Sequence, residues 1–201
     1  MTVSDDERNA RHAARMARKK AVIDARIAEA TLDTGVLLVI TGNGKGKSSS
    51  AFGMVARALG HGMRVGVVQF IKNRTDTGEE AFLGRHCEWH VLGDGFTWDT
   101  QNREADTRRA ESAWAVAQRM LADAQYDLVV LDELTYCLSY DYLDTAQVLA
   151  DLESRPPMQH VVVTGRAAVQ ALRDIADTVA VIADEKHAYQ AGIRAQKGLE
   201  W

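Results

Sequence analysis

The sequence has few of the residues that staple a small fold or carry a chain across a membrane. Only two cysteines, Cys87 and Cys137, occur in 201 residues, and they form no CxxC pair. We therefore interpret them as reduced thiols of a cytosolic protein. No apolar run approaches the roughly 18 residues that a membrane helix needs, and the N-terminus lacks the apolar core of a signal peptide. These absences predict a cytoplasmic protein with no membrane partner.

An excess of positive charge is also missing. Lys and Arg number 24 against 28 Asp and Glu, which gives a net charge of −4. Proteins that bind nucleic acid usually carry a basic footprint, so a nucleic-acid partner is not expected. What the chain does have is a hydrophobic fraction of 46%. A chain of this length buries roughly 70% of its unfolded surface, so it needs neither a disulfide nor a metal to hold its core.

Residues 1–33 form a segment of their own, rich in Ala, Arg, Lys, Asp and Glu and without Gly or Pro. The pattern predicts a polar helix that begins with a capping box at Ser4 and Glu7. Its weak apolar side comprises Met16, Val22, Ile23, Ile27 and Ala30. Two interpretations stay open: a solvated helix or tail, or a mobile segment that closes over a site or a partner subunit.

The remainder, residues 34–201, alternates short apolar runs with helical stretches. The predicted strands are 36–41, 64–70, 126–132, 160–165 and 178–183, with 88–93 as a weaker sixth. Near-continuous β-branched runs are typical of parallel strands buried on both faces. Helices are predicted at 48–60, 104–124, 144–154 and 167–176. The expected fold class is therefore α/β, with an open, mostly parallel sheet of five to six strands and helices on both faces.

An open parallel sheet binds its ligand beyond the carboxyl ends of its strands. The first such end carries TGNGKGKSS, residues 41–49, which has the strand, glycine-rich turn, Gly-Lys-Ser and helix of a phosphate loop. This pattern refines the fold class to a P-loop NTPase of the RecA-like type. The residues expected to bind phosphate are Gly42, Asn43, Gly44, Lys45, Gly46, Lys47, Ser48 and Ser49.

The phosphate loop departs from the usual pattern. Gly42 and Gly46 enclose three residues instead of four, and Thr41 stands where the first glycine is expected. Glycines still let backbone N–H groups approach phosphate oxygens. Lys47 is expected to reach those oxygens, and the Ser48 hydroxyl to bind Mg²⁺. A glycine-rich turn without ligand is the alternative. Phosphate binding is expected in spite of this departure.

Two other strand ends carry charged candidates. Asp132 and Glu133 follow LVVL at the end of one strand, where they would position Mg²⁺, or where the glutamate would orient an attacking water in a hydrolase. Arg166 belongs to TGR, residues 164–166, directly after another strand, and could contact phosphate there. The alternatives are a plain polar strand end for the carboxylates and an exposed arginine without a role.

Between the predicted strand 88–93 and the next helix lies a glycine-flanked aromatic loop with Phe96 and Trp98. Aromatic side chains are costly to expose unless they cover something. Composition alone favours core packing for the pair, with a flat organic ligand as the alternative. Within the following helix, we assign Trp114, Met120 and Leu121 to the core.

Together these segments resemble one family, the P-loop type of ATP:corrinoid adenosyltransferase, which acts on cob(I)alamin or cob(I)yrinic acid a,c-diamide. The matching stretches run in the family's order and spacing from about Val36 to Trp201. They are TGNGKGKSS, AFGMVARALGHGMRVGVVQFIK, GFTWDTQNREAD, LVVLDELTY, TGR and KHAYQAGIRAQKG. Threonines are common in the family where this chain has Ser48 and Ser49, and serine keeps the hydroxyl. The N-terminal segment matches only loosely.

The resemblance implies an activity in cobalamin biosynthesis or salvage. In this family, the phosphate loop holds the triphosphate of ATP as a leaving group, in an orientation reversed relative to ordinary P-loop ATPases. The Co(I) centre of the corrinoid attacks C5′ of the ribose, and triphosphate is released. An altered loop fits this chemistry, because the attack is on carbon and no γ-phosphoryl group has to be presented.

The resemblance also implies roles for the residues. Lys45 and Lys47 would neutralise the leaving group, and Ser48, Glu133 and Asp132 would hold Mg²⁺. Phe96 and Trp98 would press on the lower face of the corrin and exclude an axial ligand from cobalt. A flavin-type reductase would supply electrons, and the enzyme would be a homodimer whose N-terminal helix folds over the corrinoid.

Two other classes of function compete with this one. A P-loop ATPase or kinase would use the same loop and carboxylates, but it gives no reason for the GFTW stretch and would release ADP and phosphate. A regulatory module would bind Mg-ATP without turnover and make no product with any corrinoid. A visible spectral change on corrinoid binding separates the transferase from both.

Overall fold

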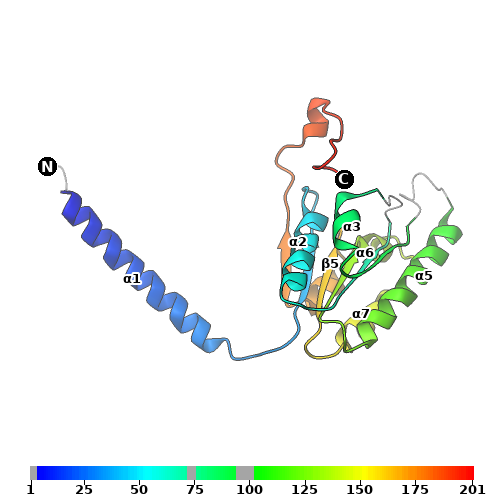
Figure 1. Cartoon of the computed structure of the whole chain (residues 1–201), viewed down its shortest axis with the longest axis horizontal. Coiled ribbons are helices and arrows are strands. Elements are labelled where there is room, and N and C mark those ends of the chain that lie inside the picture. The colour runs from blue at the N-terminus through cyan, green and yellow to red at the C-terminus, as the bar shows by residue number, and fades with distance from the viewer. Residues whose placement is uncertain (1–3, 72–75, 94–101) are drawn as a thin grey trace. The chain divides into compact units, whose positions relative to one another are not determined.

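The computed structural model describes residues 4–71, 76–93 and 102–201. The chain divides into two compact units, Met1–Asp33 and Thr34–Trp201 (Figure 1). The first unit is one helix, α1 (Asp5–Glu29), and the second is an α/β domain. None of the described helices combines the length and the apolar character that crossing a bilayer requires.

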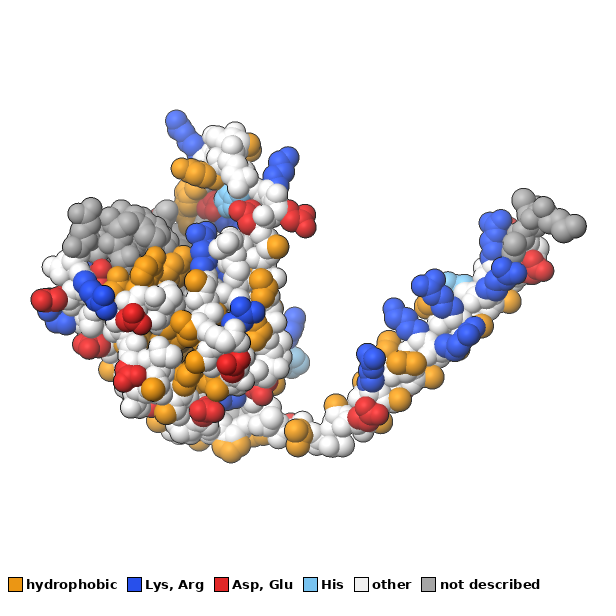
Figure 2. Space-filling model, turned by 180° about the vertical axis from the view of Figure 1, so that it is seen from behind, with side chains coloured by type: hydrophobic (Ala, Val, Ile, Leu, Met, Phe, Trp, Pro, Cys, Tyr) orange, Lys and Arg blue, Asp and Glu red, His pale blue; other side chains and the backbone are white. Residues whose placement is uncertain are grey.

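Helix α1 is exposed along its whole length. The Ser4 hydroxyl accepts a hydrogen bond from the Glu7 N–H at 3.3 Å, as the predicted N-terminal cap requires. Its predicted apolar side is present but uncovered, with Val22 56% and Ile27 65% exposed. Basic side chains run along the helix, as Figure 2 shows; they are Arg8, Arg11, Arg15, Arg18, Lys19, Lys20 and Arg26.

The α/β domain is built on one six-stranded sheet in the order β3-β2-β4-β5-β1-β6, in which every neighbouring pair is parallel. The strands are β1 (Leu37–Thr41), β2 (Val65–Gln69), β3 (Glu88–Val91), β4 (Leu128–Asp132), β5 (His160–Thr164) and β6 (Thr178–Val181). The predicted open parallel sheet is confirmed, and the weak sixth candidate, 88–93, is edge strand β3.

Helices cover both faces of this sheet. They are α2 (Lys47–Gly60), α3 (Gly78–Leu83), α5 (Arg103–Ala122), α6 (Leu134–Ser139), α7 (Thr145–Glu153) and α8 (Gln170–Ile175), and a 3₁₀ turn, η1 (Ala188–Ala191), lies near the C-terminus. Alternate residues of β4 point to opposite faces: Leu128 and Val130 pack with α2 and α3, and Val129 and Leu131 pack with α5 to α8. The prediction that Trp114, Met120 and Leu121 lie in the core is confirmed.

Two sequence predictions need correction, and two short helices were not predicted. The run 178–183 was predicted as a buried strand, but β6 lies at the edge of the sheet, with Val181 61% exposed. The run 167–176 becomes helical only at Gln170, because Ala167 adopts a positive φ of 50°. Helices α3 and α6 were not predicted, since six residues each are too few to show a helical period.

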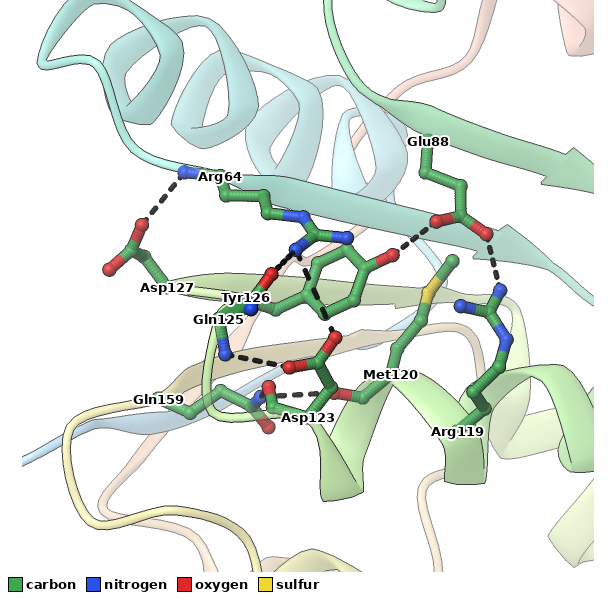
Figure 3. A network of polar contacts seen from close by, with 9 residues as sticks. All are labelled: Arg64, Glu88, Arg119, Met120, Asp123, Gln125, Tyr126, Asp127 and Gln159. Atoms are coloured by element: carbon green, nitrogen blue, oxygen red, sulfur yellow. Dashed lines mark hydrogen bonds and ion pairs between the residues drawn. The ribbon is translucent and has the colours of Figure 1, made fainter.

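A polar network joins the amino ends of three strands, at the edge opposite the phosphate loop (Figure 3). The Arg64 guanidinium lies 4.4 Å from the centre of the Tyr126 ring, and Glu88 accepts hydrogen bonds from the Tyr126 hydroxyl and from Arg119. Burial opposes ionisation of Glu88, but these hydrogen bonds outweigh it and lower the pKa of Glu88 to about 2. These contacts therefore link the amino ends of β2, β3 and β4 to one another and to α5.

Both cysteines are free thiols, as the sequence predicts. Burial raises the pKa of Cys87 to about 11 and that of Cys137 to about 12. Both are therefore protonated at neutral pH and are poor nucleophiles.

Candidate active site

The loop between β1 and α2 packs closely against the chain that follows β6. The Gly44 N–H donates to the Ile182 carbonyl at 2.9 Å, and a Cβ at Gly44 would lie 2.2 Å from the Ala183 carbonyl oxygen. Only glycine fits that approach. Gly46 closes the loop with a φ of 113° and is the N-cap of α2. It has no side chain to accept from the first-turn N–H groups, so the helix start is suited to an anion.

Lys47 is the first residue of α2 and directly follows the loop. It is only 8% exposed, and its Nζ donates to the Gly44 carbonyl at 2.7 Å. Desolvation lowers the pKa of Lys47, and Glu133 and Asp132 partly oppose that shift, whereas Arg166 and Lys45 add to it. These neighbours show that the fold brings together the charged residues predicted from three separate strand ends.

The two predicted carboxylates occupy different environments. Asp132 is fully buried at the end of β4, and it accepts from Gln69 Nε2 at 2.8 Å and from Thr164 Oγ1 at 2.6 Å. Glu133 is less buried and has a positive φ of 64° as the N-cap of α6. Left-handed backbone at a residue other than glycine is costly and is concentrated at functional sites. Asp132 is thus held by protein donors, and Glu133 is the more accessible of the two.

The TGR segment after β5 completes this edge. Gly165 has a φ of 134°, and a Cβ there would lie 2.1 Å from Thr135 Oγ1 and 3.1 Å from Glu133 Oε2. Thr135 Oγ1 donates to the Arg166 carbonyl at 2.6 Å. Burial raises the pKa of Tyr136, the charge of Glu133 raises it further, and the positive charge of Arg166 opposes the shift. The Arg166 side chain is exposed and can therefore meet a phosphate at the loop.

The C-terminus also reaches the phosphate loop. Glu200 forms an ion pair with Lys45, whose side chain is 40% exposed. Trp201 lines a cavity of about 540 Å³ together with Ser49 and Phe52 from α2 and Phe82 from α3. Of the two lysines predicted to bind phosphate, Lys45 and Lys47, Lys45 is therefore already paired with a carboxylate from the C-terminal segment.

Other predicted site residues have plainer environments. Asn43 and Ser49 are exposed, and Gly42 and Ser48 are partly exposed. Phe96 and Trp98 lie outside the described residues. Both ends of their loop are described, however. A Cβ at Gly93 would lie 2.1 Å from the Ile71 backbone beyond β2, and the Asn102 side chain caps α5 by accepting from the Ala105 N–H at 3.1 Å. Gly93 thus lies at the carboxyl edge of the sheet, beside the residue that follows Phe70.

The residues around Lys47 suit a magnesium ion that is bound together with a polyphosphate. Ser48, Asp132 and Glu133 offer hard oxygen donors. Among the described residues, no group of three His, Cys, Asp or Glu side chains gathers into a metal site made by protein alone. Mg²⁺ is usually bound through one or two carboxylates plus substrate phosphates, so this donor set fits it.

Sequence reasoning missed several residues that touch the site, among them Gln69, Tyr136, Thr164 and Glu200. Gln69 is a polar residue at the end of an otherwise apolar buried strand, which is the one signal that could have identified it. Glu200 had no such signal, because its partner Lys45 lies 155 positions away.

Fold and site define a P-loop nucleotide-binding protein of the α/β class. Residues 33–201 match the family described as ATP:corrinoid adenosyltransferase BtuR/CobO/CobP, and the chain belongs to this family. Residues 1–27 match a separate family described as the N-terminal part of cob(I)alamin adenosyltransferase.

Similar proteins cover nearly the whole chain. A corrinoid adenosyltransferase of Pseudomonas aeruginosa is 60% identical over 198 residues, which are 97% of this chain and 98% of the relative. One from Escherichia coli K12 is 48% identical over 192 residues, with 95% and 98% covered. One from Sinorhizobium is 44% identical over 198 residues, with 96% and 92% covered.

Proposed function

We propose that this protein transfers the 5′-deoxyadenosyl group of ATP to the Co(I) centre of a reduced corrinoid and releases triphosphate, in cobalamin biosynthesis or salvage. One observation carries the proposal: Lys45, Lys47 and Arg166 gather with Asp132 and Glu133 at the phosphate loop of a chain that belongs to the ATP:corrinoid adenosyltransferase family. The ordinary ATPase or kinase alternative is not favoured by that membership.

The reaction is a displacement at carbon. An electron pair of Co(I) forms the bond to C5′, the C5′–O bond breaks, and its electrons leave with the triphosphate. The nucleophile carries no proton, so the protein needs no general base. Its contribution is positioning and stabilisation of the leaving group. Lys47 is placed for this role because it is buried beside the loop, where a charge acts more strongly than in water.

Magnesium would be held by Ser48 and Glu133, with Asp132 close by. When bound, it would neutralise part of the triphosphate charge. Asp132 already accepts two protein hydrogen bonds, so we assign it to the support of the site and Glu133 to the more direct contact. Residues Gly42 to Ser48, together with Ser49, would hold the phosphates, through backbone N–H groups other than that of Gly44, which already donates to the Ile182 carbonyl.

The proposal extends to partners. Either cob(I)alamin or cob(I)yrinic acid a,c-diamide would serve as the corrinoid, a flavin-type reductase would supply electrons, and the protein would act in the cytoplasm as a homodimer. These assignments rest on the family resemblance.

The N-terminal segment, residues 1–33, would fold over the corrinoid, from the same subunit or from the partner of a homodimer. The exposed apolar side chains of α1 support this proposal, because Val22, Ile23 and Ile27 are each more than 40% exposed and would gain by covering a ligand. The match of residues 1–27 to an adenosyltransferase N-terminal family also supports it.

Placing aspartates at Ile23 and Ile27 should weaken corrinoid binding by about ten-fold or more, since burying an aliphatic side chain contributes about 1.5–3 kcal/mol. The dissociation constant for the corrinoid, measured by visible absorbance, tests this prediction.

Deletion of residues 1–33 should also weaken corrinoid binding and leave the fold of the α/β domain intact, because both core clusters lie in residues 34–201. Unchanged corrinoid affinity in both variants would show that residues 1–33 are a solvated helix or tail that does not cover the corrinoid.

Glu200 is expected to compete with the triphosphate for Lys45. Glu200→Gln should therefore tighten Mg-ATP binding by about two- to five-fold, the range of a partly exposed ion pair. Calorimetric titration with Mg-ATP measures the effect, and Glu185→Gln in the same C-terminal segment is the matched control. Weaker binding by Glu200→Gln alone would mean that Glu200 orients Lys45 and does not compete for it.

The test of the proposed function is anaerobic incubation with Mg-ATP carrying a label in its ribose and with chemically reduced cob(I)alamin. The label is expected to appear in a corrinoid product that chromatographs as adenosylcobalamin. Label that stays wholly in adenine nucleotides would contradict the proposal.

A further inference from the structure

Gln69 is a buried polar residue whose position the core does not explain. It ends β2, a strand buried at every position, and is 1% exposed. A buried amide is costly unless it is hydrogen-bonded. Gln69 Nε2 donates to Asp132 Oδ2 at 2.8 Å, and Gln69 Oε1 accepts from Trp89 Nε1 at 3.0 Å. The amide therefore bridges an indole and the buried site carboxylate.

The other oxygen of Asp132 is held from the opposite side. Thr164 Oγ1 donates to Asp132 Oδ1 at 2.6 Å, and the same hydroxyl accepts from the Glu133 N–H at 3.0 Å. Trp89, Gln69, Asp132 and Thr164 belong to β3, β2, β4 and β5, which are consecutive in the sheet. A continuous hydrogen-bonded chain thus crosses four strands and ends at the strained backbone of Glu133.

Each member of the chain has a fixed direction. An indole N–H can only donate, so it selects the amide orientation in which Gln69 turns its oxygen to Trp89 and its NH₂ to Asp132. Two donors on different oxygens then fix the plane of the Asp132 carboxylate. The one hydroxyl of Thr164 serves Asp132 and the Glu133 backbone together, so the two carboxylate residues are positioned by one group.

Trp89 also contacts the helix that carries Lys47. Its ring centroid lies 4.9 Å from that of Phe52 on α2, at an interplanar angle of 44°. Phe52 is 4% exposed and belongs to the first turns of the helix that begins at Lys47. The same indole therefore touches the phosphate-loop helix through its ring and the Asp132 support through its N–H.

We infer that Trp89, Gln69 and Thr164 are positioning residues that fix Asp132 and Glu133 relative to Lys47, so that the carboxylates are preorganised for magnesium bound with the nucleotide. This inference rests on the proposed function for the identity of the ligand. Groups that orient metal-binding carboxylates typically change metal affinity when removed. The chain offers such groups on both oxygens of Asp132.

Gln159 is a matched control for Gln69, because it is a buried glutamine with a purely structural role in the same domain. Gln159 is also buried, at 2% exposure, and its Nε2 donates to the Met120 and Asp123 carbonyls at 3.1 Å each. It precedes β5 at the amino edge of the sheet, opposite the phosphate loop. Loss of Gln159 removes two hydrogen bonds, one buried and one partly buried, without touching Asp132 or Glu133.

The experiment compares Gln69→Leu, Thr164→Val and Trp89→Phe with Gln159→Leu, all in the full chain. ATP dissociation constants are measured by calorimetry with Mg²⁺ and with EDTA, and Tm is recorded for each variant. The ratio of the two constants isolates the contribution of magnesium. A loss of stability alone does not move this ratio.

Gln69→Leu and Thr164→Val should reduce the gain in ATP affinity from Mg²⁺ by about 10- to 100-fold. Thr164→Ser, which keeps the hydroxyl, should restore it. Trp89→Phe keeps a ring beside Phe52 and loses only the N–H, so a smaller reduction is expected. Gln159→Leu should lower Tm by several degrees, about as expected for a buried hydrogen-bond loss, and leave the ratio unchanged.

A wild-type ratio in Gln69→Leu and Thr164→Val would overturn the inference, as would an equal change in Gln159→Leu. If Gln69→Leu does not fold, the inference is tested by comparing the Mg²⁺-dependent gain in ATP affinity between Thr164→Val and Thr164→Ser. A wild-type protein whose ATP affinity is independent of Mg²⁺ would also overturn the inference, yet it would leave adenosyl transfer standing. Failure of the transfer assay with these ratios as expected would instead reject the proposed function alone.

Discussion

Replacement of Lys47 by alanine is expected to lower kcat/KM for ATP by about 100- to 1,000-fold, the loss typical of a preorganised group that stabilises developing charge. Lys47 is nearly buried, and its Nζ is held by the Gly44 carbonyl. Its removal also takes away a cation whose charge interacts with Glu133 and Asp132. The triphosphate would then meet uncompensated negative charge.

Steady-state kinetics with reduced cobalamin measure this loss. Lys45→Ala should cost less, because Lys45 is partly exposed and already paired with Glu200. Lys186→Ala removes an exposed lysine of the C-terminal segment and serves as the matched control for net charge. A Lys47→Ala enzyme within three-fold of the wild type would show that the loop does not stabilise the leaving group.

The second large effect is expected for the aromatic pair. Phe96→Ala and Trp98→Ala should each lower adenosylation by about 100-fold or more, since small misplacements of a reacting centre cost that much. By the family resemblance, these rings would press on the lower face of the corrin and leave cobalt four-coordinate, which would make Co(II) easier to reduce.

ATP binding should persist in both variants, because neither ring belongs to the phosphate loop. The absorbance change of a Co(II) corrinoid on binding in the presence of Mg-ATP reports loss of the axial ligand, and it should vanish with the activity. Trp114→Phe, in the core of the domain, controls for the loss of an indole elsewhere. Full activity in both loop variants would reject the pressing role.

The fold could be predicted largely from local patterns of apolar residues in the sequence. The β-branched runs of β1, β2, β4 and β5 indicated strands buried on both faces, and the structure confirms them. The exposure of β6 could not be predicted in this way, because a strand's place at the edge depends on the order of the whole sheet. Helices α3 and α6 were too short for their period to be recognised.

The site was predicted where its chemistry is contiguous in the sequence. Gly-Lys-Ser after a strand indicated Lys47 and Ser48, and a strand ending in two carboxylates indicated Asp132 and Glu133. The groups that hold these residues come from elsewhere in the chain. Gln69 lies 63 positions from Asp132, and Glu200 lies 155 from Lys45. Such contacts depend on the order of the strands in the sheet and on the path of the C-terminal segment, and no local sequence motif indicates them.

The most direct test of the account is to identify the phosphate product. The protein is mixed anaerobically with Mg-ATP and chemically reduced cob(I)alamin, and triphosphate, ADP, phosphate and adenosylcobalamin are quantified together. The account predicts one triphosphate for each adenosylcobalamin formed. ADP and phosphate with an unaltered corrinoid would contradict it and would make Glu133 the water-orienting residue of an ordinary ATPase.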